Sequence, residues 1–167
     1  MAISAINVTN DQHFAKGGVK YMEIAKNGAG AQVVSAAGVA SGSIGTVVVV
    51  QFEKESAKMS VSMSKADGLT LYTVSIEGYI PKVLGTTLEQ LHEFSKEDGL
   101  KAKVYCYDNL AKPFLVGWDN VLATTAAYTD FPMVLESIEA DTGSALQDTN
   151  GYTVKFTSVQ ATPPAQY

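Results

Sequence analysis

The sequence predicts a mainly β fold, a two-sheet β sandwich or barrel with one flanking α-helix at about residues 86–98. Two observations support this prediction. In residues 57–64, methionine and valine alternate with serine and lysine, and a period of two places successive side chains on opposite faces of a strand. The helical segment instead carries apolar side chains at the spacing of one helix face, at Leu88, Leu91 and Phe94.

Four strands are predicted before the helix, at residues 19–25, 46–54, 57–64 and 69–80. The second contains four consecutive valines, which predicts a strand buried on both faces at its start. The intervening residues 27–45 are uncharged and rich in small side chains, and we expect a long flexible loop that orders on a partner. The glycines of this candidate assembly loop are Gly28, Gly30, Gly38, Gly42 and Gly45.

The start of the helix is predicted from a capping box. Thr86 and Glu89 have the spacing at which a hydroxyl and a carboxylate satisfy the free backbone N–H groups of a first helical turn. An apolar stripe should bury the helix against one end or edge of a sheet, and its members are Leu84, Leu88, Leu91 and Phe94.

Four more strands are predicted after the helix, at residues 100–107, 113–118, 132–140 and 152–160. Two prolines in the tail, residues 161–167, prevent the last strand from continuing. A chain of 167 residues with no linker or repeat fits a single β-rich domain, residues 1–167.

The charge inventory argues against nucleic-acid recognition. The net charge is −5, and all 12 basic residues are lysine. Arginine is the usual residue for paired contacts to phosphate and guanine, so we expect no sequence-specific nucleic-acid binding. No apolar run approaches the roughly 20 residues of a spanning helix, which predicts no membrane association. The first residues lack the basic and apolar regions of a secretory signal, so we expect none, and the single Cys106 fits a reducing compartment of synthesis.

Acidic residues dominate one long stretch. No basic residue lies between Lys112 and Lys155, whereas that stretch contains Asp119, Asp130, Glu136, Glu139, Asp141 and Asp148. One interpretation is a solvated outer surface. The other is a lumen surface that repels nucleic acid so that the polymer slides past it.

No catalytic residue, metal site or cofactor site is predicted. His13 and His92 have no companion ligands at metal-binding spacing, and no segment fits the nucleophile motif Gly-x-Ser-x-Gly. Gly28 and Gly30 begin a dinucleotide-binding pattern whose third glycine is missing. Cys106 alternates with apolar residues, which predicts a small buried side chain. We therefore expect a protein that is not an enzyme.

A family resemblance supplies a functional expectation. Residues 80–119 combine an apolar strand, a capped helix and the segments Leu-Lys-Ala-Lys-Val-Tyr-Cys-Tyr-Asp-Asn and Pro-Phe-Leu-Val-Gly-Trp-Asp. A hairpin containing Thr-Gly-Ser-Ala-Leu-Gln-Asp-Thr-Asn-Gly-Tyr-Thr-Val-Lys-Phe follows. This arrangement resembles small virion structural proteins of tailed bacteriophages, and the implied fold is similar to the tail-tube fold shared with the hemolysin-coregulated tube proteins of secretion systems.

The resemblance implies a non-enzymatic virion subunit that is made in the bacterial host cytoplasm. Its partners would be copies of itself and other virion proteins. In that family, six copies close a ring through sheet edges, and a long early loop stacks ring on ring; residues 27–45 stand where that loop would be. Head-decoration, neck and minor capsid roles remain open alternatives. From another class, a β barrel that binds one small ligand also remains open.

Overall fold

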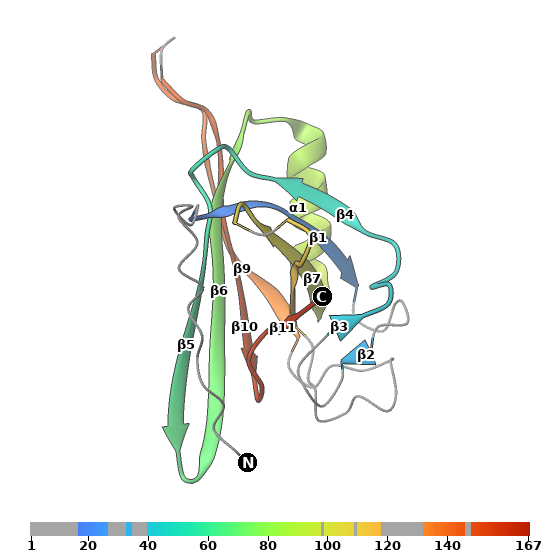
Figure 1. Ribbon diagram of the computed structural model, residues 1–167. Helices are drawn as coiled ribbons and strands as arrows, with labels where there is room; N and C mark the ends of the chain where they lie inside the picture. The colour runs from blue at the N-terminus through green and yellow to red at the C-terminus, as the bar shows by residue number, and fades with distance from the viewer. Residues whose placement is uncertain are drawn as a thin grey trace, which may run out of the picture.

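The computed structural model describes residues 17–26, 33–34, 40–97, 99–108, 110–117, 132–145 and 148–167. Figure 1 shows a mainly β architecture with one helix, α1 (Gly85–Lys96). Nine strands form one large antiparallel sheet: β1 (Val19–Lys26), β4 (Val48–Gln51), β5 (Lys58–Ala66), β6 (Leu69–Pro81), β7 (Leu100–Cys106), β8 (Phe114–Val116), β9 (Met133–Asp141), β10 (Gly151–Gln160) and β11 (Ala165–Gln166). A separate ribbon pairs β2 (Val33–Val34) with β3 (Ala40–Ser41).

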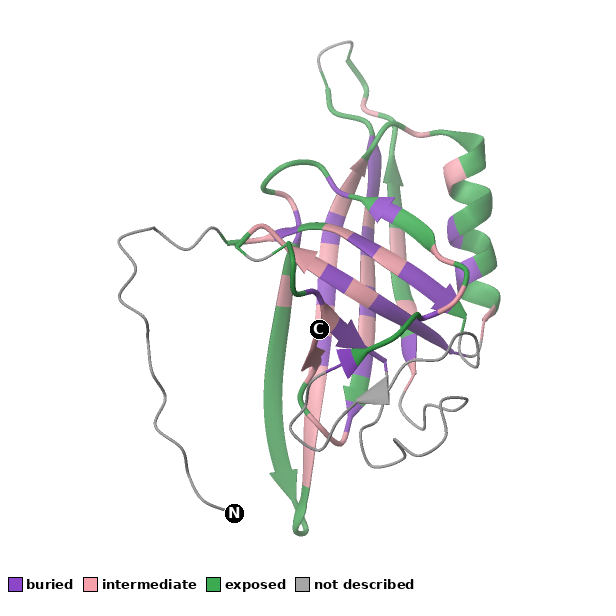
Figure 2. Ribbon diagram, turned by 45° about the vertical axis from the view of Figure 1, so that its right-hand side comes forward, coloured by how far each residue is buried: buried purple, intermediate pink, exposed green. Residues whose placement is uncertain are grey.

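The large sheet has two regions that differ in strand direction. The long region contains β9, β10, β6 and β5 in that order, and the crossing region contains β11, β8, β7, β1 and β4. The regions join at a single residue pair, Leu100 of β7 with Met133 of β9. Figure 2 shows that β1 and β7 run across the long strands. The sheet is not closed, because β5 pairs only with β6 within the described residues.

The main core lies where the long region, the crossing region and α1 face one another. Period-two alternation buries every second residue of β10 from Tyr152 to Gln160, including Phe156, and buries Val74 and Ile76 in the middle of β6. The crossing region contributes Met22 and Val104 from its inner face. From α1, Phe94 packs edge-on against Phe156, with 6.4 Å between the ring centroids. Each fully buried apolar side chain stabilises the fold by about 1.5–3 kcal/mol.

The helix differs from the prediction at its start and along its apolar stripe. It begins at Gly85 after Leu84, whose side chain makes no capping hydrogen bond, so the predicted capping box is wrong. The backbone N–H of Leu88 already donates to the carbonyl of Leu84 at 3.1 Å, which places Thr86 inside the first turn. Leu91 and Phe94 are buried, but Leu84 and Leu88 are 51% and 47% exposed.

Strand β4 also corrects the prediction, because its first residues are not buried on both faces. Val48 and Val49 are 37% and 48% exposed, while Val50 and Phe52 are buried. The reason is position: among the described residues β4 pairs only with β1, so it lies at an edge of the sheet. A run of valines predicts a strand, but neighbouring strands decide which faces are covered.

The segment predicted as a flexible loop is partly packed. Ala40 and Ile44 are buried in a second, smaller cluster with Ala25 and Leu115, on the face of the crossing region opposite the main core. Their small and β-branched side chains fill that surface, which explains why this part of residues 27–45 has a defined position. Within the described residues, no helix combines the length and the apolar character needed to cross a membrane.

Candidate assembly surface

The long region ends in two strand edges that lack backbone partners over most of their length. Among the described residues, β5 pairs only with β6, so the other edge of all nine residues is open. At the opposite end, again among the residues that the structure describes, β9 pairs along one edge with β10 and meets β7 only at Met133. Open edges are templates for pairing with another chain, and soluble monomers usually cover or interrupt them.

Apolar side chains on β5 remain exposed on the face that continues the core. Val61 and Met63 are 45% and 63% exposed, although their partners across the ladder, Val74 and Tyr72, belong to the strand that contributes to the core. In Figure 2 nearly the whole of β5 is exposed, whereas the strands inside the sheet alternate between buried and partly buried residues. The hairpin of β5 and β6 therefore extends the apolar face beyond the part of the core that this chain covers.

The opposite face of the long region is rich in hydroxyl groups. Alternation places serine and threonine side chains on this outward face of all four strands: Ser60, Ser62, Ser64, Thr73, Ser75, Ser137, Thr153 and Thr157. Its lysines are paired, since Lys155 donates to Glu136 at 2.9 Å and the Nζ of Lys58 lies 3.8 Å from a carboxylate oxygen of Glu77. The outward face is mainly hydrophilic, although Leu69, Val134 and Val159 are exposed on it, and it carries no unpaired cluster of positive charge among these residues.

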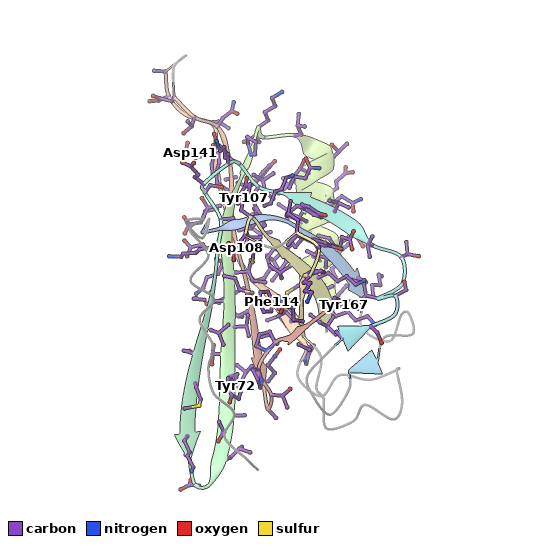
Figure 3. The ribbon with its side chains drawn as sticks, in the orientation of Figure 1. Tyr72, Tyr107, Asp108, Phe114, Asp141 and Tyr167 are labelled. Carbon is purple, nitrogen blue, oxygen red and sulfur yellow. The ribbon has the colours of Figure 1, made fainter. Side chains whose placement is uncertain are left out.

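The six predicted lumen acids do not form one cluster. Asp119 and Asp130 lie outside the described residues. Glu136 and Glu139 are exposed on β9, and Asp141 ends that strand, at the upper tip of the long strands in Figure 3. Asp148 lies in the following loop and has its own local role.

Two of these acids organise a turn. The N–H of Gly143 donates to Oδ1 of Asp141 at 2.8 Å. Oδ2 of Asp148 accepts from the N–H groups of Ala145 and Ser144 at 2.7 and 2.8 Å, and these backbone bonds lower the pKa of Asp148. Their carboxylates stabilise the loop between β9 and β10.

The glycines of the predicted assembly loop are also divided. Gly28, Gly30 and Gly38 lie outside the described residues. Gly42 and Gly45 have φ angles of 87° and 97°, a region that favours glycine. The carbonyl of Gly42 accepts a hydrogen bond from Nζ of Lys103 at 3.4 Å, so the end of this segment is held against β7.

An aromatic cluster holds the C-terminal residue against the same strand. Tyr21 and Tyr105 are stacked with 4.3 Å between their ring centroids, and the hydroxyl of Tyr105 donates to Glu23 at 3.0 Å. Nζ of Lys103 lies 4.0 Å from the ring centroid of Tyr167, which Figure 3 shows on the crossing region. Burial raises the pKa of Tyr167 to about 12, and burial followed by the bond to Glu23 raises the pKa of Tyr105. Tyr105 and Tyr167 are therefore neutral structural anchors.

The described residues contain no group of three or more histidine, cysteine, aspartate or glutamate side chains arranged to hold a metal ion. His92 is exposed on α1, and half-buried Cys106 lies against the main core, where burial raises the pKa of its thiol. A groove of about 390 Å³ runs between β4 and α1, lined by Val48, Gln90 and their neighbours. It is one feature of the described surface that fits the small-ligand alternative.

Sequence reasoning missed the two open edges and the exposed helix leucines. The alternation of β5 was visible, but no local pattern shows how far a strand overhangs its neighbours. No family model matches the chain, and no curated protein or solved structure shows significant similarity to it.

Proposed function

We propose that this chain is a non-enzymatic structural subunit that assembles into rings through the open edges of β5 and β9, and that stacked rings form a bacteriophage tail tube for genome passage. The observation that carries the proposal is the pair of open edges at opposite ends of one four-stranded region. The edges belong to different strands, so their contact is head-to-tail, and head-to-tail contacts generate rings or helical filaments.

Because the long region has an even number of strands, such a contact would continue its antiparallel sheet from one copy to the next. Each neighbouring pair in the long region is antiparallel, so β5 and β9, at the two ends of four strands, run in opposite directions. A second copy related by rotation about an axis roughly along the strands can therefore place its β5 antiparallel to β9 of the first copy. The assembled sheet then alternates direction throughout, with every strand flanked on both edges.

The stagger of the two edges is also suitable for a closed barrel. The central residue of β5, Ser62, pairs with Thr73 of β6. The central residue of β9, Ser137, pairs with Lys155 of β10, which in turn pairs with Glu77 of β6. Thr73 and Glu77 are four residues apart, or about 13 Å along a strand, and four strands span about 19 Å across a sheet. Full overlap of β5 with β9 thus requires a strand tilt of about 35°, within the range of closed barrels.

The bulk of each subunit determines which face would form the inner wall. The crossing region and α1 both cover the core face of the long region, and a ring has more room on its outer circumference. The hydroxyl-rich outward face therefore lines the lumen, together with Glu136 and Glu139. Hydroxyls and carboxylates without arginine hold phosphates weakly, which suits a surface along which a genome moves. In this arrangement the subunit is a two-layer β sandwich rather than a closed barrel.

Native mass spectrometry and electron microscopy of the purified chain at increasing concentration test the proposal. We expect rings and then tubes whose inner wall carries the long region. A strict monomer at high concentration, carrying a small molecule in the groove between β4 and α1, would instead support the ligand-binding alternative. Particles whose copies contact one another only through other surfaces, as a decoration or neck protein would, also contradict the tube.

A further inference from the structure

We infer that α1 presents a docking surface, formed by Leu84 and Leu88, that receives the exposed apolar side chains of β5 from a second copy of this chain. The inference rests on the proposed ring and specifies the contact that holds it together. Leu84 and Leu88 are the exposed members of the apolar stripe of α1, and Val61 and Met63 are the exposed apolar residues in the body of β5. All four side chains remain exposed in the described chain, at 45–63% of their surface.

The position of α1 directs these leucines toward the open edge of β9. The hydroxyl of Tyr152, which pairs with Ala140 of β9, donates to the carbonyl of Leu84 at 3.0 Å. Further along the helix, Phe94 packs on Phe156, which pairs with Leu135 of β9. The helix therefore follows β9 from the level of Ala140 to that of Leu135.

The two flanks of the helix face different neighbours. Thr86, Gln90 and Glu93 line the grooves between α1 and β4, so that flank faces the crossing region. At 3.6 residues per turn, Leu84 and Leu88 lie on the other flank, beyond the buried positions Leu91 and Phe94. That flank borders β9, and a strand added to β9 would pass beside it.

The register of the added strand follows from two constraints. Directly opposed residues of antiparallel strands point to the same face, so apolar core-side residues of β5 must oppose core-side residues of β9. Aligning Ser62 with Ser137 satisfies this condition from Ser137 to Asp141 and places Val61 opposite Ile138. The β-bulge of β9 between Leu135 and Ser137 shifts the register by one residue beyond that point, so Met63 is placed opposite the core-side Leu135. A shift of one residue would send every apolar side chain of β5 to the hydroxyl-rich face.

The same register extends favourably toward the end of β9. Met59 is placed opposite Ala140 on the core side, and Lys58 is placed opposite Asp141 on the outward face. Opposite charges directly across an antiparallel pair stabilise it, whereas like charges destabilise it. The contact thus combines backbone pairing along β9, an apolar layer under α1 and one ion pair at the end, all with a second copy.

Disulfide trapping tests the register. In a Cys106→Ser background, which removes the only cysteine of the chain, Lys58→Cys protein is mixed with Asp141→Cys protein and oxidised. We expect efficient cross-linked heterodimers, because a disulfide needs Cα atoms within about 7 Å. The matched control pairs Lys58→Cys with Val134→Cys, at the other end of β9, which should cross-link at least tenfold less. Rings that form without the first cross-link would overturn the register and leave the proposed function standing.

Substitution on α1 tests the docking surface. Leu88→Gln should raise the concentration needed for ring formation at least tenfold. Glu89→Gln, at an exposed neighbouring position on the solvent side of α1, should leave that concentration unchanged. Both variants should keep the circular dichroism spectrum and the melting temperature of the parent, because both positions are exposed. Normal assembly of the folded Leu88→Gln protein would refute the role of the helix. Absence of rings even for the parent chain would refute the proposed function itself.

Discussion

Strands β10 and β5 carry the same alternating pattern but have opposite surroundings. In β10, every second residue from Tyr152 to Gln160 is buried, because β6 and β9 flank it and α1 and the crossing region cover one face. In β5, Met59, Val61 and Met63 occupy the equivalent face, yet the strand is exposed along almost its whole length. Alternation therefore encodes which face is apolar, and the position of the strand in the sheet determines whether that face is covered within one chain.

This difference separates residues that stabilise the fold from residues that are available to stabilise an assembly. A side chain of β10 contributes to the free energy of unfolding of the single chain. A side chain of β5 contributes little to it and retains most of its burial energy for a contact with another chain. Substitutions in the two strands should consequently affect different measurements.

The largest effect on folding is expected for Phe156→Ala in β10. The ring is fully buried and packs against Phe94, so its removal leaves a cavity and should lower the free energy of unfolding by about 3–5 kcal/mol. Urea denaturation followed by circular dichroism measures this change. A loss below 1 kcal/mol would show that β10 is not part of the stabilising core.

An intermediate, pH-dependent effect is expected for Lys101 in the crossing region, which contrasts with the exposed Lys58 of β5. Burial lowers the pKa of Lys101 from 10.5 to about 8. Between pH 8 and 10.5 the unfolded chain thus binds a proton that the folded chain has released, and stability rises with pH in that window.

The comparison of parent and Lys101→Met proteins isolates this contribution. From pH 8 to 9.5 the free energy of unfolding of the parent should rise relative to that of the variant by about 1–2 kcal/mol. Equilibrium denaturation at each pH measures the difference, and the other titrating groups are common to both proteins. Parallel pH profiles would show that Lys101 keeps its ordinary pKa in the folded chain.

The smallest effect on folding is expected for Met63→Ser in β5. Because the side chain is 63% exposed, the free energy of unfolding should change by no more than about 0.5 kcal/mol. Assembly should nevertheless weaken, since the substitution removes apolar surface from the proposed contact. Ser62→Thr, on the outward face of the same strand, is the matched control for both measurements. Equal assembly of the two variants would argue against a role for the apolar face of β5.

Much of the fold was predictable from the sequence because the local residue pattern of several strands agrees with the structure that they adopt. The predicted segments 57–64, 69–80 and 152–160 coincide with β5, β6 and β10 to within two residues, and the helix at 86–98 coincides with α1 to within two residues at each end. Alternation and helical periodicity are properties of neighbouring residues, and tertiary contacts here reinforced them.

The remaining features depended on contacts between distant segments. The burial of Ala40 and Ile44 requires the surface formed by Ala25 and Leu115, which no local pattern reveals. The last strand was predicted to end before the prolines, and β10 does end at Gln160, but the return of the tail as β11, in which Ala165 pairs with Leu115, was not predicted. The predicted lumen acids were correctly noted as a run of charge, but Glu136 pairs with Lys155 and Asp141 caps a turn. The candidate site was the least predictable part, because an open edge is defined by what does not lie beside it.

The difference between the two edges has a consequence for the timing of assembly. In the proposed assembly, any incomplete arc of subunits ends in one open β5 and one open β9, so each added subunit leaves both kinds of edge open until the arc closes into a ring. The last contact is intramolecular, with an effective concentration far above that of free subunits, and it removes both ends at once. A contact of moderate affinity would therefore be enough to form a stable ring. Short arcs would dissociate readily and so release misplaced subunits, whereas a closed ring must break two contacts to lose one subunit.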